Sequence, residues 1–254
     1  MNQRIITHDG RFHADETMAV AILKEFLGDI PVQRTRNVSS EELADPAVWV
    51  VDVGSVLDPN NRCFDHHQDG ELPSACVLVA DFLNRIGIID DAVHTELDAV
   101  LSTISDIDRN GYRSYNGFQF NSLIGTLADG QAGFHEAVGI CRKLVKALIK
   151  SAADVEESRR IWERGEELHP MVRVCERYPM HWKRFVEACI LIYPSNGKWR
   201  AVSSDGHSLP LQGQGKETFI HRNRSIAGYR NRKDAEQASL GSVKALHLVK
   251  SKKD

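Results

Sequence analysis

The pattern of hydrophobic and polar positions changes past Pro170 and divides the chain into two parts. In the first part, short apolar runs alternate with segments whose apolar residues recur three and four positions apart. Strands are predicted at residues 4–7, 32–35 and 49–53, and a helix is predicted at 15–27. Such alternation favours a parallel sheet with helices on its faces.

Three further helices are predicted in this first part. Two lie between residues 74 and 108, and the apolar positions from Phe134 to Val155 fit one long helix. Past Pro170, strands are predicted at 185–193, 199–203, 218–222 and 225–229, before a closing helix at 233–248. We therefore expect an α/β protein with a parallel-sheet N-terminal domain at 1–168, which includes the long linking helix, and a smaller α+β domain at 169–254.

Composition agrees with a globular protein, because 42% of the 254 residues are hydrophobic. Every apolar run is much shorter than the roughly 20 residues that a membrane span needs, and residues 1–4 do not begin an apolar signal core. The five cysteines are odd in number and include no C-x2-C pair, which argues against a disulfide framework and a zinc ribbon. We expect a cytoplasmic protein without membrane contact.

The charge is distributed unevenly along the chain. Residues 1–165 carry 16 Lys and Arg against 26 Asp and Glu, and residues 166–254 carry 16 against 9, within a total of −3. Carboxylates in the first part could hold cations, and the basic second part could attract an anionic substrate. Solvated surfaces explain the same imbalance equally well.

Candidate metal ligands follow three of the apolar segments. The segment from His8 to Glu16 contains H-x4-H-x-D, Asp52 ends an apolar run, and the pentapeptide 64–68 reads Phe-Asp-His-His-Gln. In open parallel sheets, ligands gather beyond the carboxyl ends of the strands. A single His or Asp in a loop is usually a polar surface residue, but three such segments together favour a metal site.

The ligand types suggest a centre with two divalent ions. Asp52 is the best bridge, with His8 and His13 on one ion and Asp15, His66 and Asp108 on the other. His67 would bind the phosphate, and Asp65 would orient an imidazole. Asp106 is an alternative to Asp108 as a ligand, and both aspartates could instead cap a helix end. Imidazole and carboxylate ligands without thiolate favour Mn²⁺, with Mg²⁺, Co²⁺ or Zn²⁺ as alternatives.

These motifs resemble those of the DHH phosphoesterase superfamily. The segments 7–16, 51–54 and 64–68 are most similar to the melanocyte proliferating gene-one (Myg1) family, and the segment 219–230 resembles that family's closing motif. The resemblance implies two domains with a manganese-type dinuclear centre in the cleft between them. It also implies 3′–5′ exonuclease activity on RNA.

The second part offers a candidate substrate-binding set: His221, Arg222, Arg224 and Gly228. The basic residues could hold a phosphate or the 3′ end of a nucleotide, and Gly228 would let backbone approach closely. A solvated basic hairpin is the alternative. Aromatic residues are few in this region, which suits short oligonucleotides better than a long stacked strand.

The residues therefore predict a metal-dependent phosphodiesterase acting on RNA or short oligonucleotides from the 3′ end. A phosphomonoesterase or pyrophosphatase could use the same ligands, and a nucleotide- or RNA-binding module with a degenerate centre is the non-catalytic alternative. The number of subunits is left open, and a homodimer is allowed.

Overall fold

The computed structural model describes residues 3–111, 119–127 and 130–250, with the side chains of 247–250 left aside. Its contacts divide the chain into two units, 1–153 and 154–254. The long helix α6, Gly130–Arg164, passes through this division. The division falls before residue 168, where we expected the domains to meet, because α6 contributes its last turns to the second unit.

The first unit contains a five-stranded sheet with the order β2-β1-β3-β5-β4. Strands β1, β2, β3 and β5 run parallel, and β4 is an antiparallel edge strand. The strands are β1 Arg4–Thr7, β2 Val32–Arg34, β3 Val48–Val51, β4 Leu57–Asp58 and β5 Cys63–Phe64. The three predicted strands are confirmed, whereas the short β4 and β5 were not predicted.

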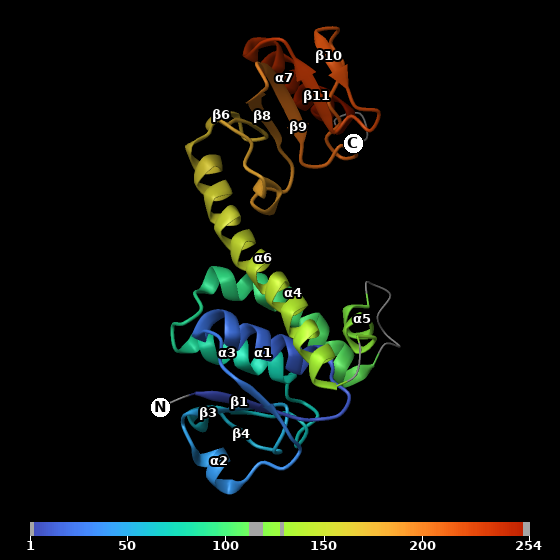
Figure 1. Ribbon diagram of the computed structural model, residues 1–254. Helices are drawn as coiled ribbons and strands as arrows, with labels where there is room; N and C mark the ends of the chain where they lie inside the picture. Colours follow the sequence, from blue (N-terminus) through green and yellow to red (C-terminus); the bar gives the residue numbers. More distant parts are fainter. Residues whose placement is uncertain (1–2, 112–118, 128–129, 251–254) are drawn as a thin grey trace. The chain divides into compact units, whose positions relative to one another are not determined.

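Alternating side chains of this sheet enter two apolar layers. Ile5 packs in the larger core with residues of the helices, and its neighbour Ile6 packs in a smaller core with Val38 and Leu43. The larger core is covered by α1 Ala14–Leu27, α3 Ala75–Arg85, α4 Asp91–Asn110 and the first part of α6. The short helix α2, Ser40–Ala44, lies on the opposite face, as Figure 1 shows.

The parallel direction of the strands brings three loops to one edge. β1 ends directly before His8, β3 ends directly before Asp52, and β5 ends directly before Asp65. Parallel strands have their carboxyl ends at the same edge of a sheet. This edge is therefore where the predicted ligands meet.

The second unit contains a six-stranded sheet with the order β10-β11-β9-β8-β7-β6. Its pairs are antiparallel except for β7 with β8. The strands are β6 Glu166–His169, β7 Val172–Val174, β8 Ile190–Ser195, β9 Lys198–Ser203, β10 Glu217–Ile220 and β11 Ile226–Tyr229. Helix α7, Arg232–Lys250, packs on one face through Ala235, Ala238 and Val243.

One strand prediction in this unit was partly wrong. We expected a strand at 185–193, but β8 begins only at Ile190, and Trp182–Arg184 forms a 3-10 turn. Phe185 ends this turn and Val186 packs against the small core of Trp182 and Leu191, so the apolar character of residues 185 and 186 reflects packing next to a turn.

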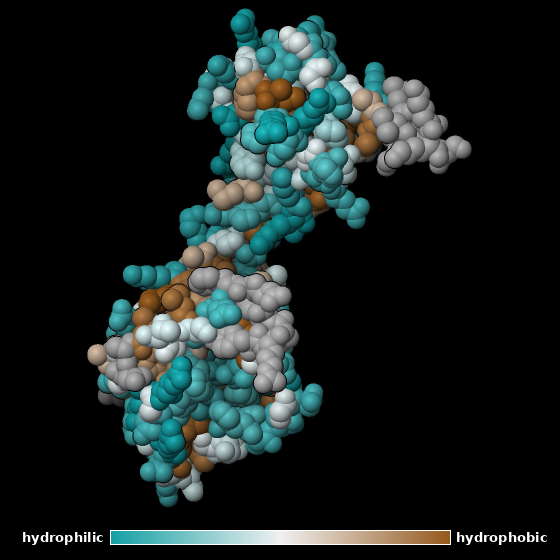
Figure 2. All heavy atoms as spheres, turned by 90° about the vertical axis from the view of Figure 1, so that its right-hand side faces the viewer, coloured by the Kyte–Doolittle hydropathy of each residue, from teal (hydrophilic) through white to brown (hydrophobic). Residues whose placement is uncertain are grey.

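The face of the protein drawn in Figure 2 is mostly hydrophilic, with hydrophobic residues in small groups. Among the described residues, no helix combines the length and the apolar character needed to cross a bilayer.

Candidate metal centre

Asp52 lies at the centre of the edge formed by the three loops. Its side chain is almost fully buried, and its backbone has φ 56°, the left-handed region that non-glycine residues seldom adopt. Aspartate and asparagine enter this region more readily than other residues with a side chain. The turn at the end of β3 thus directs a buried carboxylate into the cluster at a cost in backbone strain.

His8 and Glu16 lie on one side of Asp52. The Nε2 atom of His8 is 3.1 Å from Oε1 of Glu16 and 3.5 Å from Oδ2 of Asp52. The exposed His13 belongs to the same group of ligand atoms. Glu16 was absent from the predicted ligands, although its place in the first turn of α1, next to Asp15, is a signal that the sequence contains.

His66 lies on the other side of Asp52. Its Nε2 atom is 3.3 Å from Oδ1 of Asp52, 3.4 Å from Oδ2 of Asp108 and 3.8 Å from Oδ2 of Asp15. Three carboxylates therefore face one imidazole nitrogen. Asp15, His66 and Asp108 are the ligands predicted for the second ion, and Asp52 is the predicted bridge.

The register of α4 distinguishes the two aspartates at its end. Asp106 is exposed and accepts a hydrogen bond from Nδ2 of Asn110 at 2.8 Å, whereas Asp108 is partly buried and faces His66. Positions two residues apart on a helix point in nearly opposite directions. The structure therefore places Asp108 in the cluster and Asp106 outside it.

Asp65 and His67 form a separate pair at the rim of the cluster. Asp65 accepts hydrogen bonds from the backbone N–H groups of Ser55 at 2.7 Å and His67 at 3.0 Å, and it lies 2.7 Å from Nδ1 of His67. The His67 side chain is 60% exposed. A carboxylate at Nδ1 keeps the proton there and fixes the ring, so Nε2 is the nitrogen left for a ligand.

The carboxylates of the cluster lie close enough together to disfavour one another's negative charge. Burial, with the charges of Asp52 and Glu16, raises the pKa of Asp15 well above its usual value. Burial and the charge of Asp52 also raise the pKa of Asp108. Burial opposes a charge on His8, but hydrogen bonds to Asp52 and Glu16 outweigh it and raise the pKa of His8 to about 10. Divalent cations would relieve this excess of negative charge.

The described residues fit such cations. Three overlapping groups of ligand atoms each lie within 4.8 Å: His8, His13, Glu16 and Asp52; Asp52, His66 and His67; and His13, Asp15 and Asp108. Buried atoms without a hydrogen-bond partner include Oδ1 of Asp52, Nε2 of His66 and both carboxylate oxygens of Asp15. Unsatisfied buried polar atoms are costly, and a bound cation would satisfy all of these.

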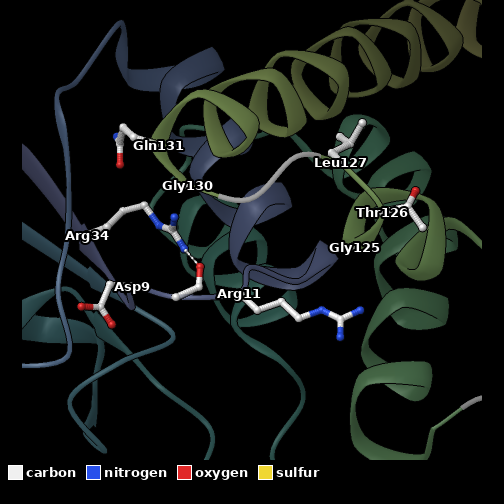
Figure 3. A pocket seen from close by; sticks show the side chains of 9 residues that line it. Asp9, Arg11, Arg34, Gly125, Thr126, Leu127, Gly130 and Gln131 are labelled. Atoms are coloured by element: carbon white, nitrogen blue, oxygen red, sulfur yellow. Dashed lines mark hydrogen bonds between the residues drawn. The ribbon is translucent and has the colours of Figure 1, made fainter.

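A cavity of about 450 Å³ opens over the cluster. It is lined by His8, Arg11, His13, Arg36, Asp52, Val53, Gly54, Ser55, Asp65 and His67. A neighbouring cavity of about 790 Å³, drawn in Figure 3, shares Arg11 and includes Arg34. Arg34 donates a hydrogen bond to the carbonyl of Gly10 at 2.8 Å, which holds the loop that carries Arg11. The cluster of acids is thus bordered by arginines.

The four predicted substrate-binding residues lie on one hairpin of the second unit. Arg224 N–H donates to the carbonyl of His221 at 2.8 Å, which closes the turn between β10 and β11. The imidazole of His221 is hydrogen-bonded to the Asn223 side chain at 2.6 Å, and Arg222 and Arg224 are exposed. Gly228 is buried in β11. Their role in substrate binding stays a prediction.

Residues 4–74, which contain most of these ligands, match the model of the MYG1 exonuclease family, described as "Uncharacterised protein family (UPF0160)". The MYG1 protein of Chlamydia pneumoniae is 28% identical over 210 residues, which are 66% of this chain and 70% of that protein. A MYG1 protein of Caenorhabditis elegans is 29% identical over 163 residues, 53% of this chain and 47% of that protein.

The human protein named MYG1 exonuclease is 45% identical over 67 residues, 26% of this chain and 17% of the human protein. The chain thus matches less than half of the worm relative and a small part of the human one. A solved Vibrio pGpG-specific phosphodiesterase aligns over 98% of this chain and 99% of its own, but with a TM-score of 0.36 and 10% identity, which supports no conclusion.

Proposed function

We propose that this chain is a member of the Myg1 family and a metal-dependent phosphodiesterase that hydrolyses RNA or short oligonucleotides from the 3′ end. The observation that carries the proposal is Asp52, a buried carboxylate whose two oxygens face different imidazoles. The name of the human relative supports an exonuclease rather than another phosphoesterase.

Two divalent ions, Mn²⁺ by ligand type, would share Asp52. The first would take His8 and His13, with Glu16 as an added ligand, and the second would take Asp15, His66 and Asp108. When bound, such ions supply a nucleophilic hydroxide and neutralise charge on the phosphoryl group.

His67 and Asp65 act on the substrate side of the cluster. Asp65 holds Nδ1 of His67, and in the imidazolium form the ring can also donate a hydrogen bond from Nε2 to a phosphoryl oxygen in the cavity. Asp65 is satisfied by backbone N–H groups and His67, which makes it a positioning residue. Arg11 and Arg36 line the same cavity and offer positive charge to the flanking phosphates.

The decisive experiment incubates the full chain and Mn²⁺ with a 5′-labelled RNA of about ten nucleotides. Hydrolysis from the 3′ end gives a ladder of shortening labelled products, whereas hydrolysis from the 5′ end releases the label at once as a mononucleotide. Pyrophosphate and p-nitrophenyl phosphate serve as matched substrates for the alternative activities. Turnover of either one without RNA cleavage contradicts the proposal.

A further inference from the structure

One row of side chains crosses three strands of the second unit. In register, Phe219 of β10 pairs with Gly228 of β11, and Gly228 pairs with Arg200 of β9. Directly opposed residues on neighbouring strands share one face of a sheet. An aromatic ring, a position without a side chain and a guanidinium therefore lie side by side.

This row lies on the face opposite to α7. The adjacent row contains Ala227 and Ala201, which belong to the core that α7 covers. On the opposite face, the end of α6 and the turn around Trp182 cover Leu191 and Val202. The part of that face around Gly228 remains open as a cavity of about 250 Å³.

Gly228 determines the shape of this cavity. Two ring carbons of Phe219 lie only 2.7 Å from the position that a Cβ at residue 228 would occupy. The ring can therefore rest on bare backbone, and a larger residue would displace it. Phe219 nevertheless remains 44% exposed, so part of its ring is available to a ligand.

The chemistry of the lining favours a nucleotide. The described residues that line the cavity are Ser195, Asn196, Lys198, Trp199, Arg200, Thr218, Phe219 and Gly228, and none of them is acidic. Arg200 pairs in register with Tyr193 of β8, so these two side chains lie on the same face of the sheet. Exposed aromatic rings beside cations on a sheet are the arrangement by which proteins bind single-stranded nucleic acid.

We propose that this face binds one nucleotide of a single-stranded substrate, with the base stacked on Phe219 and a phosphate held by Lys198 and Arg200. The proposal rests on the proposed function for the identity of the substrate, but the site belongs to the second unit and contains no metal ligand. It adds a base contact to the phosphate contacts predicted for Arg222 and Arg224. A site of this kind makes the enzyme select nucleic acid over small phosphate esters.

The test measures binding of the full chain to two fluorescent probes by anisotropy, in EDTA to prevent hydrolysis. One probe is a 5′-labelled RNA tetranucleotide, and the other is its abasic counterpart with the same phosphates. Phe219→Ala should weaken RNA binding about tenfold and leave the abasic probe unchanged. Lys198→Gln with Arg200→Gln should weaken both probes and reduce the salt dependence of binding.

Ile220→Ala is the matched control, because Ile220 is the next residue of β10, is 38% exposed and points to the opposite face. Phe219→Tyr retains the ring and should bind like the wild type, which separates stacking from a folding defect. Equal binding of the two probes by the wild type, no binding at all, or equal losses in Phe219→Ala and Ile220→Ala would overturn the site. The last outcome would instead indicate that either truncation disturbs the edge strand β10 as a whole.

Hydrolysis of bis(p-nitrophenyl) phosphate with Mn²⁺ is measured on the same proteins. A wild type that binds RNA through Phe219 but hydrolyses neither RNA nor this diester leaves the site standing and refutes the proposed function. Equal rates of RNA cleavage by the wild type and by Phe219→Ala would support the proposed function and refute the nucleotide site.

Discussion

The proposed dinuclear centre depends above all on one residue, Asp52. Burial acts to raise its pKa, but the imidazoles of His8 and His66, at 3.5 and 3.3 Å from its two oxygens, outweigh burial and lower the pKa. The sequence predicted this residue as the bridge because it ends a buried apolar strand. It could not predict φ 56°, because a left-handed turn at a non-glycine residue follows from the tertiary contacts that hold it.

Asp52→Asn separates charge from backbone conformation. Asparagine adopts the left-handed region as readily as aspartate, so the fold should persist while the bridging anion is lost. Turnover of RNA with Mn²⁺ should fall by at least about a thousandfold, roughly 4 kcal/mol of transition-state stabilisation. Bound Mn²⁺ counted by elemental analysis should fall as well. Near-normal turnover would remove Asp52 from the centre.

At the scale of elements, helices and strands with a clear apolar pattern were predicted from the sequence. Short strands that depend on pairing with a neighbouring strand were missed. Helix α1 was predicted from its apolar spacing, and β1 and β3 from continuous apolar runs. Strands β4 and β5 have two residues each, too few for a pattern to appear. Strand β6 is half exposed and polar, so its place in the sheet comes from pairing with β7.

Helix α1 also explains how Glu16 reaches the cluster. Both oxygens of Glu16 accept hydrogen bonds from the backbone N–H of His13, at 2.7 and 2.8 Å, across the first turn. The same carboxylate lies 3.1 Å from His8. One side chain thus closes the start of the helix and faces the metal ligands, a double role that helix spacing alone does not reveal.

Glu16→Gln should therefore lower both the folding stability and the affinity for Mn²⁺. Glu42→Gln is the matched variant that separates these two effects. Glu42 makes the same kind of backbone contact at the start of α2, to Ser39 N–H at 3.0 Å, and also pairs with Arg4 outside the cluster. Gln still accepts the backbone N–H bond, so each Gln variant should lose only the charge near the helix N-terminus, about 0.5 kcal/mol of folding stability in urea unfolding. Only Glu16→Gln should weaken Mn²⁺ binding, measured by calorimetry. Equal Mn²⁺ affinity in both variants would exclude Glu16 as a ligand.

At the scale of the molecule, the change from alternating helices and strands to a strand-rich pattern coincides with a change from a mostly parallel sheet to a mostly antiparallel one. The position of the division was harder to predict. The contacts change at residues 153 and 154, inside the uninterrupted helix α6. A helix without Gly or Pro at this point gives no local signal of a boundary, because the boundary depends on what each turn packs against.

The cysteines report on whether the two units unfold separately. All five are free and buried, as expected from their scattered positions; Cys63, Cys76 and Cys141 belong to the first unit, and Cys175 and Cys189 to the second. Burial raises the pKa of Cys63 and Cys175 to about 11. Because the thiolate is the reactive form, native thiols should resist a short pulse of N-ethylmaleimide at pH 8.

In increasing urea, Cys175 and Cys189 should become reactive together and before the other three. The second unit is the smaller one, and smaller units bury a smaller fraction of their surface. Peptide mass spectrometry after the pulse measures each site, with glutathione in the same tube as the reference for intrinsic reactivity. If all five cysteines lose protection at one urea concentration, the units unfold as a single cooperative body, because independent units would expose their thiols at separate midpoints.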